Sequence, residues 1–292
     1  MRLGRHMPLH SNAVKAVETA RNIGCDAIQI FASNPTGWRP TAGNGASCAA
    51  FARATIEFDL QPVVIHAPYL INLASPDESI WEKSIGLLQW TLQRGALLGA
   101  SSVVFHTGSH RGSGVDAGIV RIAQAIRRIL PETPPEVMLL LENDVGAGNS
   151  LGHSFEQLGA ALALLPEYDE RLGVCIDTAH LWGAGHDIST AAAAQQVLQE
   201  IDRAIGLTRL KIIHLNDTEK ALGSHRDVHA RLGEGIISEE GLRALLRDPR
   251  LSQAAVILET PIKTDEQDKE DWEHDKQQIA KARALMFSID GA

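Results

Sequence analysis

Histidines and carboxylates recur in this sequence at the ends of short apolar runs. Six of these runs finish on a side chain that can bind a metal ion: His66, His106, Glu142, Asp177, His214 and Glu259. Carboxylates that are crowded together repel one another unless a cation lies between them. A mixture of His, Asp and Glu ligands suits zinc or a similar transition metal. The run ends therefore predict a metal site, provided that the fold brings them together.

Three more candidate ligands lie in the segments that follow these runs. His180 comes shortly after Asp177, and the spacing of Asp227 and His229 places both on the same side of an extended segment. Nine ligands are too many for one four-coordinate ion, so they predict a cluster of two or three metals. Three divalent ions would outweigh the four carboxylates, attract an anion and suit in-line displacement at phosphorus.

Short apolar runs alternate with stretches of helical periodicity, and these elements must position the candidate ligands. We predict strands at Arg2–His6, Ala27–Phe31, Val63–His66, Ser102–His106, Val137–Glu142, Leu172–Asp177, Leu210–His214 and Ala254–Glu259. The run LKIIHL is apolar on both faces, as in a parallel sheet covered by helices. A repeat of about 35–40 residues is the size of one strand, one helix and their loops.

Eight such units without a break in composition predict an α/β fold. The expected architecture is one (β/α)8 TIM barrel that spans residues 1–292 as a single domain. The C-terminal ends of the strands converge on one mouth of such a barrel, so the metal site is expected there. A doubly wound sheet is the structural alternative, but it usually carries a GxGxxG loop after an early strand, and this sequence has none.

Local sequence signals add detail to this fold. Ser11 is expected to cap the first helix, which Gly24 ends. Residues 32–48 are rich in glycine, proline and asparagine and are expected to form a loop. The charged residues 264–276 are expected to form a solvent-facing N-terminus of the last helix.

Charge and composition narrow the functional class. The net charge of −9 argues against a broad basic surface that binds nucleic acid non-specifically, but it does not exclude a local binding site. The three cysteines are odd in number and widely spaced, as in a reduced, cytoplasmic protein. No apolar run approaches the roughly 18 residues of a membrane span, and the first residues lack a signal peptide. We therefore expect a cytoplasmic protein without a membrane partner.

Six stretches of the chain resemble the endonuclease IV family of apurinic/apyrimidinic endonucleases, on the barrel shared with xylose isomerase-like proteins. They are IHAPYLINLASPD (65–77), FHTGSH (105–110), LENDVGAGNSLG (141–152), GVCIDTAHLWGAGHD (173–187), HLNDTEKALGSHRDVHARLGEG (214–235) and ILETP (257–261). They run in the family's order, cover most of the chain and carry the expected residue type at all nine positions that bind the family's three zinc ions.

This resemblance implies a role for each ligand. It assigns His66, His106 and Glu142 to one zinc ion, Glu142, Asp177, His214 and Glu259 to a second, and His180, Asp227 and His229 to the third. Glu142, shared by two ions, would be the catalytic residue that controls the hydroxide between them. Mn²⁺ or Fe²⁺ could replace zinc at some positions.

The family hydrolyses the phosphodiester 5′ to abasic sites in duplex DNA and also clears blocked 3′ ends. The resemblance therefore implies a metal-dependent DNA repair endonuclease that acts as a monomer on duplex DNA. Tyr69 and Leu70 match the family residues that wedge into the base stack. Arg39, Arg226 and Arg231 lie in the expected mouth loops, where they could contact phosphates.

Three segments depart from the family pattern. Where the family loop reads KNQRQWRA and supplies an arginine that enters the DNA, this chain reads SNPTGWRP, with Thr36 in the place of that arginine. The first strand reads LGRHMP instead of a GAHVS-like run, and HTG replaces HPG after the fourth strand. The metal site is thus better supported by the sequence than the surface that reads DNA.

Two other functions stay open on the sequence alone. A sugar isomerase or epimerase of the same superfamily uses one metal and would need only Glu142, Asp177, His214 and Glu259. It would leave the other five ligands without an evident use. A protein that binds damaged DNA without turnover is favoured only by the altered loop around Thr36.

Overall fold

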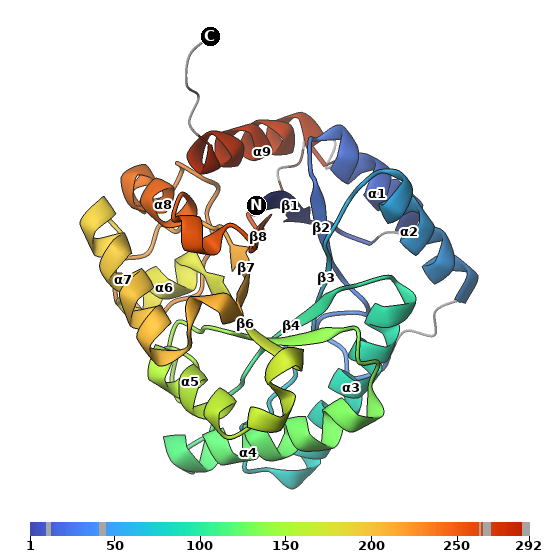
Figure 1. Cartoon of the computed structure of the whole chain (residues 1–292), viewed down its shortest axis with the longest axis vertical. Helices are drawn as coiled ribbons and strands as arrows, with labels where there is room; N and C mark the ends of the chain where they lie inside the picture. The colour runs from blue at the N-terminus through green and yellow to red at the C-terminus, as the bar shows by residue number, and fades with distance from the viewer. Residues whose placement is uncertain (10–12, 41–44, 263, 265–269, 288–292) are drawn as a thin grey trace.

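Eight parallel strands form a closed barrel at the centre of the chain (Figure 1). The computed structural model describes residues 1–9, 13–40, 45–262, 264 and 270–287. The strands are β1 (Arg2–His6), β2 (Ala27–Phe31), β3 (Val63–His66), β4 (Ser102–His106), β5 (Met138–Glu142), β6 (Leu172–Asp177), β7 (Leu210–His214) and β8 (Ala255–Leu258). Each strand pairs with the next, and β8 pairs with β1, so the predicted TIM barrel is confirmed.

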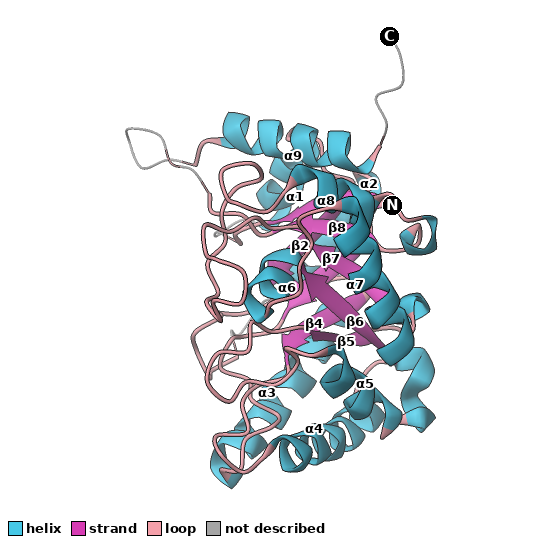
Figure 2. Cartoon of the chain, turned by 90° about the vertical axis from the view of Figure 1, so that its left-hand side faces the viewer, coloured by secondary structure: helices cyan, strands magenta, loops and turns pink. Residues whose placement is uncertain are grey.

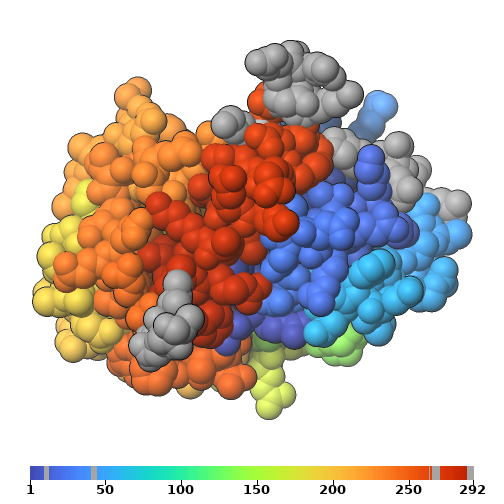
Figure 3. Space-filling view, turned by 90° about the horizontal axis from the view of Figure 1, so that it is seen from above, coloured from blue at the N-terminus to red at the C-terminus, as the bar shows by residue number. Residues whose placement is uncertain are grey.

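Helices pack around the outside of this barrel. They are α1 (Ala13–Asn22), α2 (Gly45–Glu57), α3 (Glu78–Leu97), α4 (Val115–Ile129), α5 (Phe155–Ala163), α6 (Thr178–Ala184), α7 (Ala191–Ala204), α8 (Glu239–Leu246) and α9 (Trp272–Met286). The last helix, α9, lies beside the first (Figure 3). Arg283 on α9 donates a hydrogen bond of 2.7 Å to the carbonyl of Gly24, which closes the ring of helices.

The boundaries differ from the prediction in a few places. Strand β5 begins at Met138 instead of Val137, and β8 spans Ala255–Leu258, so Glu259 follows its strand instead of ending it. The loop predicted for residues 32–48 is shorter, because α2 begins at Gly45. The predicted cap Ser11 lies outside the described residues.

One charged residue of the C-terminal segment is buried, against expectation. The Asp275 side chain is 0% exposed and lies 2.9 Å from the guanidinium of Arg5, which is itself 1% exposed. Arg5 also donates to the hydroxyl of Thr260 at 2.8 Å and to its carbonyl at 3.1 Å. Residues 265–269 of the predicted solvent-facing segment 264–276 lie outside the described residues. Asp275 does not face solvent, because it pairs α9 with β1.

Alternate residues of the strands fill the barrel interior. The inner side chains are those of Ala27, Val64, Val104, Leu140, Cys175, Ile212, Ala255 and Ile257. Side chains on a strand alternate between its two faces, so the residue two positions further along also points inward. Those residues are Gln29, His66, His106, Glu142, Asp177, His214 and Glu259. One layer at the C-terminal mouth thus collects all six of the run-end residues that the sequence singled out.

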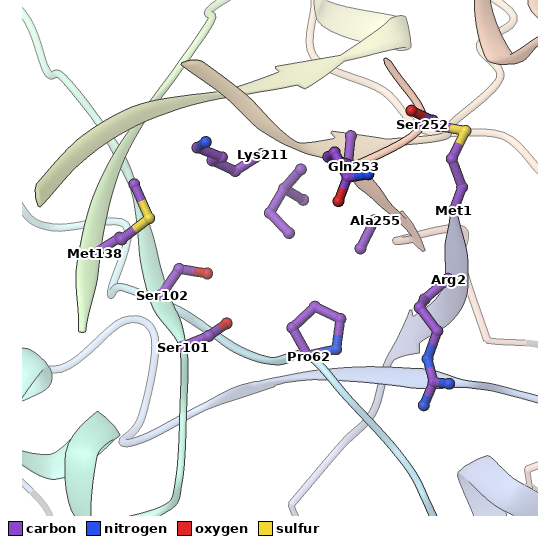
Figure 4. Close-up of a pocket in the computed structure, with 12 residues that line it drawn as sticks. Met1, Arg2, Pro62, Ser101, Ser102, Met138, Lys211, Ser252, Gln253 and Ala255 are labelled. Atoms are coloured by element: carbon purple, nitrogen blue, oxygen red, sulfur yellow. The ribbon is translucent and has the colours of Figure 1, made fainter. Parts of the chain in front are cut away.

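The two ends of the barrel differ in character. Most of the long connecting loops gather at one end (Figure 2). The opposite end has a cavity of about 290 Å³ lined by residues from the beginnings of strands, among them Arg2, Ser102, Met138 and Lys211 (Figure 4). Its lining, within the described residues, includes no candidate metal ligand. Among the described helices, none is both long and apolar enough to cross a lipid bilayer.

Candidate metal centre

Three groups of histidine and carboxylate side chains at the barrel mouth have the composition and spacing of metal sites; a fourth, Glu142, Cys175 and His214, includes a cysteine. Within each group, ligand atoms lie within 4.8 Å of one another. The groups are His66, His106 and Glu142; Glu142, Asp177, His214 and Glu259; and Asp177, His180 and His229. Glu142 belongs to the first two groups and Asp177 to the last two. The groups are therefore linked into one cluster.

Glu142 lies at the centre of this cluster. It ends β5, is fully buried, and its Oε1 lies 2.8 Å from His214 Nδ1. Its Oε2 lies 3.2 Å from His66 Nε2 and 3.7 Å from His106 Nε2. The carboxylate therefore faces histidines from β3, β4 and β7 at once, as a ligand shared by two ions would.

Asp177 positions its neighbours through the local fold. Its Oδ1 accepts a hydrogen bond of 2.9 Å from the backbone N–H of His180 and so caps α6. Its Oδ2 lies 3.5 Å from His229 Nε2. Asp227 joins the same side of the cluster, because its Oδ1 lies 3.3 Å from His180 Nε2 and 3.2 Å from His229 Nε2. The sequence did not predict that Asp177 would link two groups.

The loop after β7 brings Asp227 and His229 to the mouth. Asp217 holds this loop, because its carbonyl accepts a hydrogen bond of 2.7 Å from the N–H of Ala230. The buried Asp217 carboxylate also accepts hydrogen bonds of 3.0 Å from the backbone of Gly233, Gly235 and Ile237. A single acidic side chain thus anchors the loop that completes the nine-residue set.

The side chains of the cluster shift one another's pKa values. Burial alone would raise the pKa of Glu142, but the histidines around it, His106 and His214 foremost, hold it well below its ordinary value. Burial alone would lower the pKa of His214, but Glu259 and Glu142 raise it to about 9. The pKa of His229 is likewise raised to about 9, because Asp177 and Asp227 outweigh its burial. Ionised carboxylates therefore face protonated imidazoles when no metal is bound.

The cluster fits divalent metal ions. Among the described residues, His229 Nε2 is buried without a well-formed hydrogen bond, although carboxylate oxygens of Asp177 and Asp227 lie within 3.5 Å of it. An unpaired nitrogen among carboxylates costs free energy, which an ion in their midst would offset. His, Asp and Glu are also the ligands of zinc and similar ions. Cys175 lies below this layer, but burial raises the pKa of its thiol well above the ordinary value and keeps it neutral.

Two asparagines support the ligands and were missed by the sequence analysis. The side-chain oxygen of Asn143 accepts a hydrogen bond of 2.6 Å from the N–H of Asp177. The side-chain nitrogen of Asn216 donates a hydrogen bond of 2.5 Å to Asp177 Oδ2, and its oxygen accepts one of 2.9 Å from the N–H of Glu259. Their position one or two residues beyond a strand-end ligand was the available signal.

Two of the residues expected to contact DNA, Tyr69 and Leu70, lie next to the cluster. Tyr69 is 56% exposed, and its ring centre lies 5.6 Å from that of His66. Tyr69 and Leu70 line a cavity of about 540 Å³ together with His106 and Asp227. The aromatic and aliphatic side chains therefore stand at the edge of the metal cluster.

The three candidate arginines differ in their exposure to solvent and in their ion pairs. Arg39 and Arg226 are exposed, and no described carboxylate forms an ion pair with either of them. Arg231 is partly buried, lies 3.4 Å from the carboxylate of Glu234, and donates to the carbonyl of Pro261 at 3.2 Å. Arg39 and Arg226 are therefore better placed than Arg231 to contact a phosphate.

The residue before Thr36 contacts Tyr69 through the backbone. The N–H of Tyr69 donates a hydrogen bond of 3.0 Å to the carbonyl of Pro35. Thr36 is exposed, and both its N–H and its hydroxyl donate to the side-chain oxygen of Asn34 at 3.0 Å. Residue 36 is therefore at the rim of the mouth, where a longer side chain would extend into solvent next to Tyr69.

Comparison with known proteins agrees with this architecture. A family model described as a xylose isomerase-like TIM barrel matches residues 17–285. A protein of Chloroflexus aurantiacus named probable endonuclease 4 is 40% identical over 286 residues, which cover 98% of both chains. A probable endonuclease 4 of Halothermothrix orenii is also 40% identical, over 89% of this chain and 94% of that protein.

Solved structures extend the comparison. The crystal structure of endonuclease IV from Thermus thermophilus matches with a TM-score of 0.83 and 37% identity, over 98% of this chain and 99% of that one. D-Psicose 3-epimerase from Clostridium cellulolyticum shares the fold, with a TM-score of 0.70 and 15% identity over 98% of this chain and 97% of that one. Full-length identity near 40% to proteins named endonuclease 4, on the same barrel, leads to one conclusion: the chain belongs to the endonuclease IV family of xylose isomerase-like TIM barrels.

Proposed function

We propose that this protein is a metal-dependent DNA repair endonuclease that hydrolyses the phosphodiester 5′ to abasic sites in duplex DNA. The observation that carries the proposal is the linkage of three ligand groups through Glu142 and Asp177 at the barrel mouth. Linked groups suit several closely spaced ions, and such ions suit in-line displacement at phosphorus. The relatives named endonuclease 4 support the same activity.

The nine residues of the cluster are the proposed ligands of three zinc ions, with Mn²⁺ or Fe²⁺ possible at some positions. The ions would supply Lewis acidity, which lowers the pKa of water and offsets the charge that develops on the phosphate. Glu142 is the proposed catalytic residue, because its two carboxylate oxygens face both of the groups that contain it. It would orient the attacking water between them.

The rim of the mouth is the proposed DNA-binding surface. Tyr69 and Leu70 would enter the duplex at the lesion, as their exposure and their place beside the cluster allow. Arg39 and Arg226 would contact phosphates, and Arg231 would contribute less because Glu234 pairs with it. With a net charge of −9, the chain as a whole does not attract DNA, so this local positive charge has to do so.

The same proposal includes the organisation of the molecule. We infer that residues 1–292 act as a single domain and that the protein works as a cytoplasmic monomer. Size-exclusion chromatography with light scattering would test the oligomeric state.

Cleavage of a defined duplex tests the activity. A duplex oligonucleotide with one tetrahydrofuran abasic analogue should be cut once, on the 5′ side of the analogue, to leave a 3′-hydroxyl. The same duplex without the analogue is the matched control and should stay intact. An analogue-containing duplex left uncut by micromolar enzyme supplied with zinc or manganese would contradict the proposal.

Metal analysis separates the proposal from a single-metal sugar epimerase. That alternative requires only the group of Glu142, Asp177, His214 and Glu259, which the structure contains. It has no evident use for the two additional groups. Elemental analysis should find two to three metal ions per chain, whereas one ion per chain would favour the epimerase.

A further inference from the structure

Two polar side chains in the ligand layer are not part of the nine-residue cluster. His6 ends β1, and Gln29 lies on β2 two positions after the inward-facing Ala27. Gln29 is 0% exposed in an otherwise apolar strand. A buried amide requires hydrogen-bond partners, so its contacts indicate why it is there.

Gln29 contacts two candidate metal ligands at once. Its Oε1 lies 2.8 Å from His214 Nε2, and its Nε2 lies 2.5 Å from Glu259 Oε1. An ionised carboxylate only accepts hydrogen bonds, so the amide atom that faces Glu259 is the nitrogen donor. The amide oxygen therefore faces His214 and accepts from its Nε2–H.

This arrangement decides which nitrogen of His214 is available to an ion. Because Nε2 carries the proton shared with Gln29, the nitrogen left for a metal is Nδ1. His214 Nδ1 faces the cluster, 2.8 Å from Glu142 Oε1 and 3.2 Å from Glu259 Oε2. His6 holds the amide in this orientation, because its Nδ1 lies 2.9 Å from Gln29 Nε2 and accepts the second N–H of the amide.

Three of the four other histidines of the cluster are held differently; the fourth, His106, has no hydrogen-bond partner at Nδ1 among the described residues. The ring nitrogens that face away from the ligand groups lie next to backbone carbonyls in His66 (Ala67, 2.8 Å), His180 (Asn143, 2.9 Å) and His229 (Glu259, 3.4 Å). Substitution cannot remove a backbone carbonyl. The support of His214 is a side chain and can be removed by one mutation.

We propose that Gln29 is a positioning residue of the metal centre, which fixes the tautomer and ring orientation of His214, holds Glu259, and is itself oriented by His6. The inference rests on the proposed function, because it assumes that His214 and Glu259 bind an ion. Loss of a partner that orients a metal ligand typically weakens metal binding by about 10- to 100-fold. The expected effect is confined to the group that contains His214 and Glu259.

Zinc affinity of the Gln29→Met variant is the main test. Methionine has nearly the volume of glutamine but can neither accept from His214 nor donate to Glu259. Competition with a chelator should show one ion bound about 10- to 100-fold more weakly than in the wild type, with the remaining ions little changed. Gln29→Glu should weaken the same ion at least as much, because it places a second carboxylate against Glu259.

Gln278→Met is the matched control. Gln278 is also buried, but its amide oxygen accepts from the backbone N–H of Leu232 at 2.8 Å and contacts none of the nine candidate ligands in the described contacts. This variant should lose stability in urea and keep wild-type zinc affinity. Equal losses of zinc affinity in Gln278→Met and Gln29→Met would indicate a general packing effect and refute the inference.

A spectroscopic measurement keeps the inference testable if a Gln29 variant does not fold. In the zinc-loaded wild type, ¹H–¹⁵N NMR of the imidazoles should show His214 with its proton on Nε2 and with slow exchange against water. A proton on Nδ1 would refute the inference directly. A wild type that binds no zinc would refute the metal centre as well, whereas unchanged affinity in Gln29→Met would refute the role of Gln29 alone.

Discussion

Zinc binding to the metal-free protein should release protons, in a number that follows from the contacts of the histidines. Zinc binds neutral imidazole, so each histidine that is protonated beforehand must lose a proton. Although burial opposes it, the pKa of His214 is raised to about 9 by Glu259 and Glu142, and that of His229 to about 9 mainly by Asp177 and Asp227. The pKa of His180 is raised well above its ordinary value, again against burial, by Asp177 and Asp227.

At pH 7.5 the number of protons released is set mainly by the histidines whose pKa values are raised. A group with a pKa near 9 is about 97% protonated at pH 7.5, so His214 and His229 together carry about two protons. His180, whose pKa is also raised well above its ordinary value, adds a third. His66 adds part of a fourth, because its Glu142 contact outweighs burial and raises its pKa. The carboxylates Glu142, Asp227 and Glu259 have lowered pKa values, are already ionised at this pH and release none. The release should fall as the pH rises through 9.

Calorimetry in buffers of different ionisation enthalpy measures this number at pH 7.5. His229→Asn should lower the number of protons released on zinc binding by about one. His106→Asn is the matched control, because burial lowers the pKa of His106 and leaves it neutral, so the variant loses a ligand without changing the count. A wild type that releases fewer than about one proton, or an equal decrease in both variants, would refute this account of the cluster's charge.

Three further substitutions have expected outcomes. Glu142→Ala removes the carboxylate shared by two ligand groups and should abolish cleavage of the abasic duplex in a gel assay while far-UV circular dichroism stays unchanged; measurable turnover would rule it out as the catalytic residue. Thr36→Arg adds a cation to the rim beside Tyr69 and should tighten binding to abasic duplex in a filter-binding assay; unchanged affinity would place the loop away from DNA. Asp275→Ala leaves the Arg5 guanidinium buried without its partner and should cost about 3–5 kcal/mol in urea unfolding, and a loss below about 1 kcal/mol would contradict the buried pair.

The sequence alone predicted the barrel and the residues at its mouth, for a local reason. Each strand is short, apolar and separated from the next by a helix-sized segment, so hydrophobic periodicity is enough to place it. In parallel strands the C-terminal residues must share one end of the barrel. The sequence was therefore enough to predict that His66 and Glu142 lie close together in space, although they are far apart in the chain.

Only the tertiary structure determined how these residues are paired and supported. That Asp177 links two ligand groups depends on how the loop bearing His229 folds back, and Asp217 sets this through long-range hydrogen bonds. The sequence predicts that Asp275 is a surface charge, but in the structure α9 packs it against Arg5. Gln29 meets His214 across the barrel from 185 residues away in the chain. Local periodicity indicates which face of a strand a side chain occupies. The atoms that the side chain contacts there depend on strand register and on closure of the barrel, which no local pattern specifies.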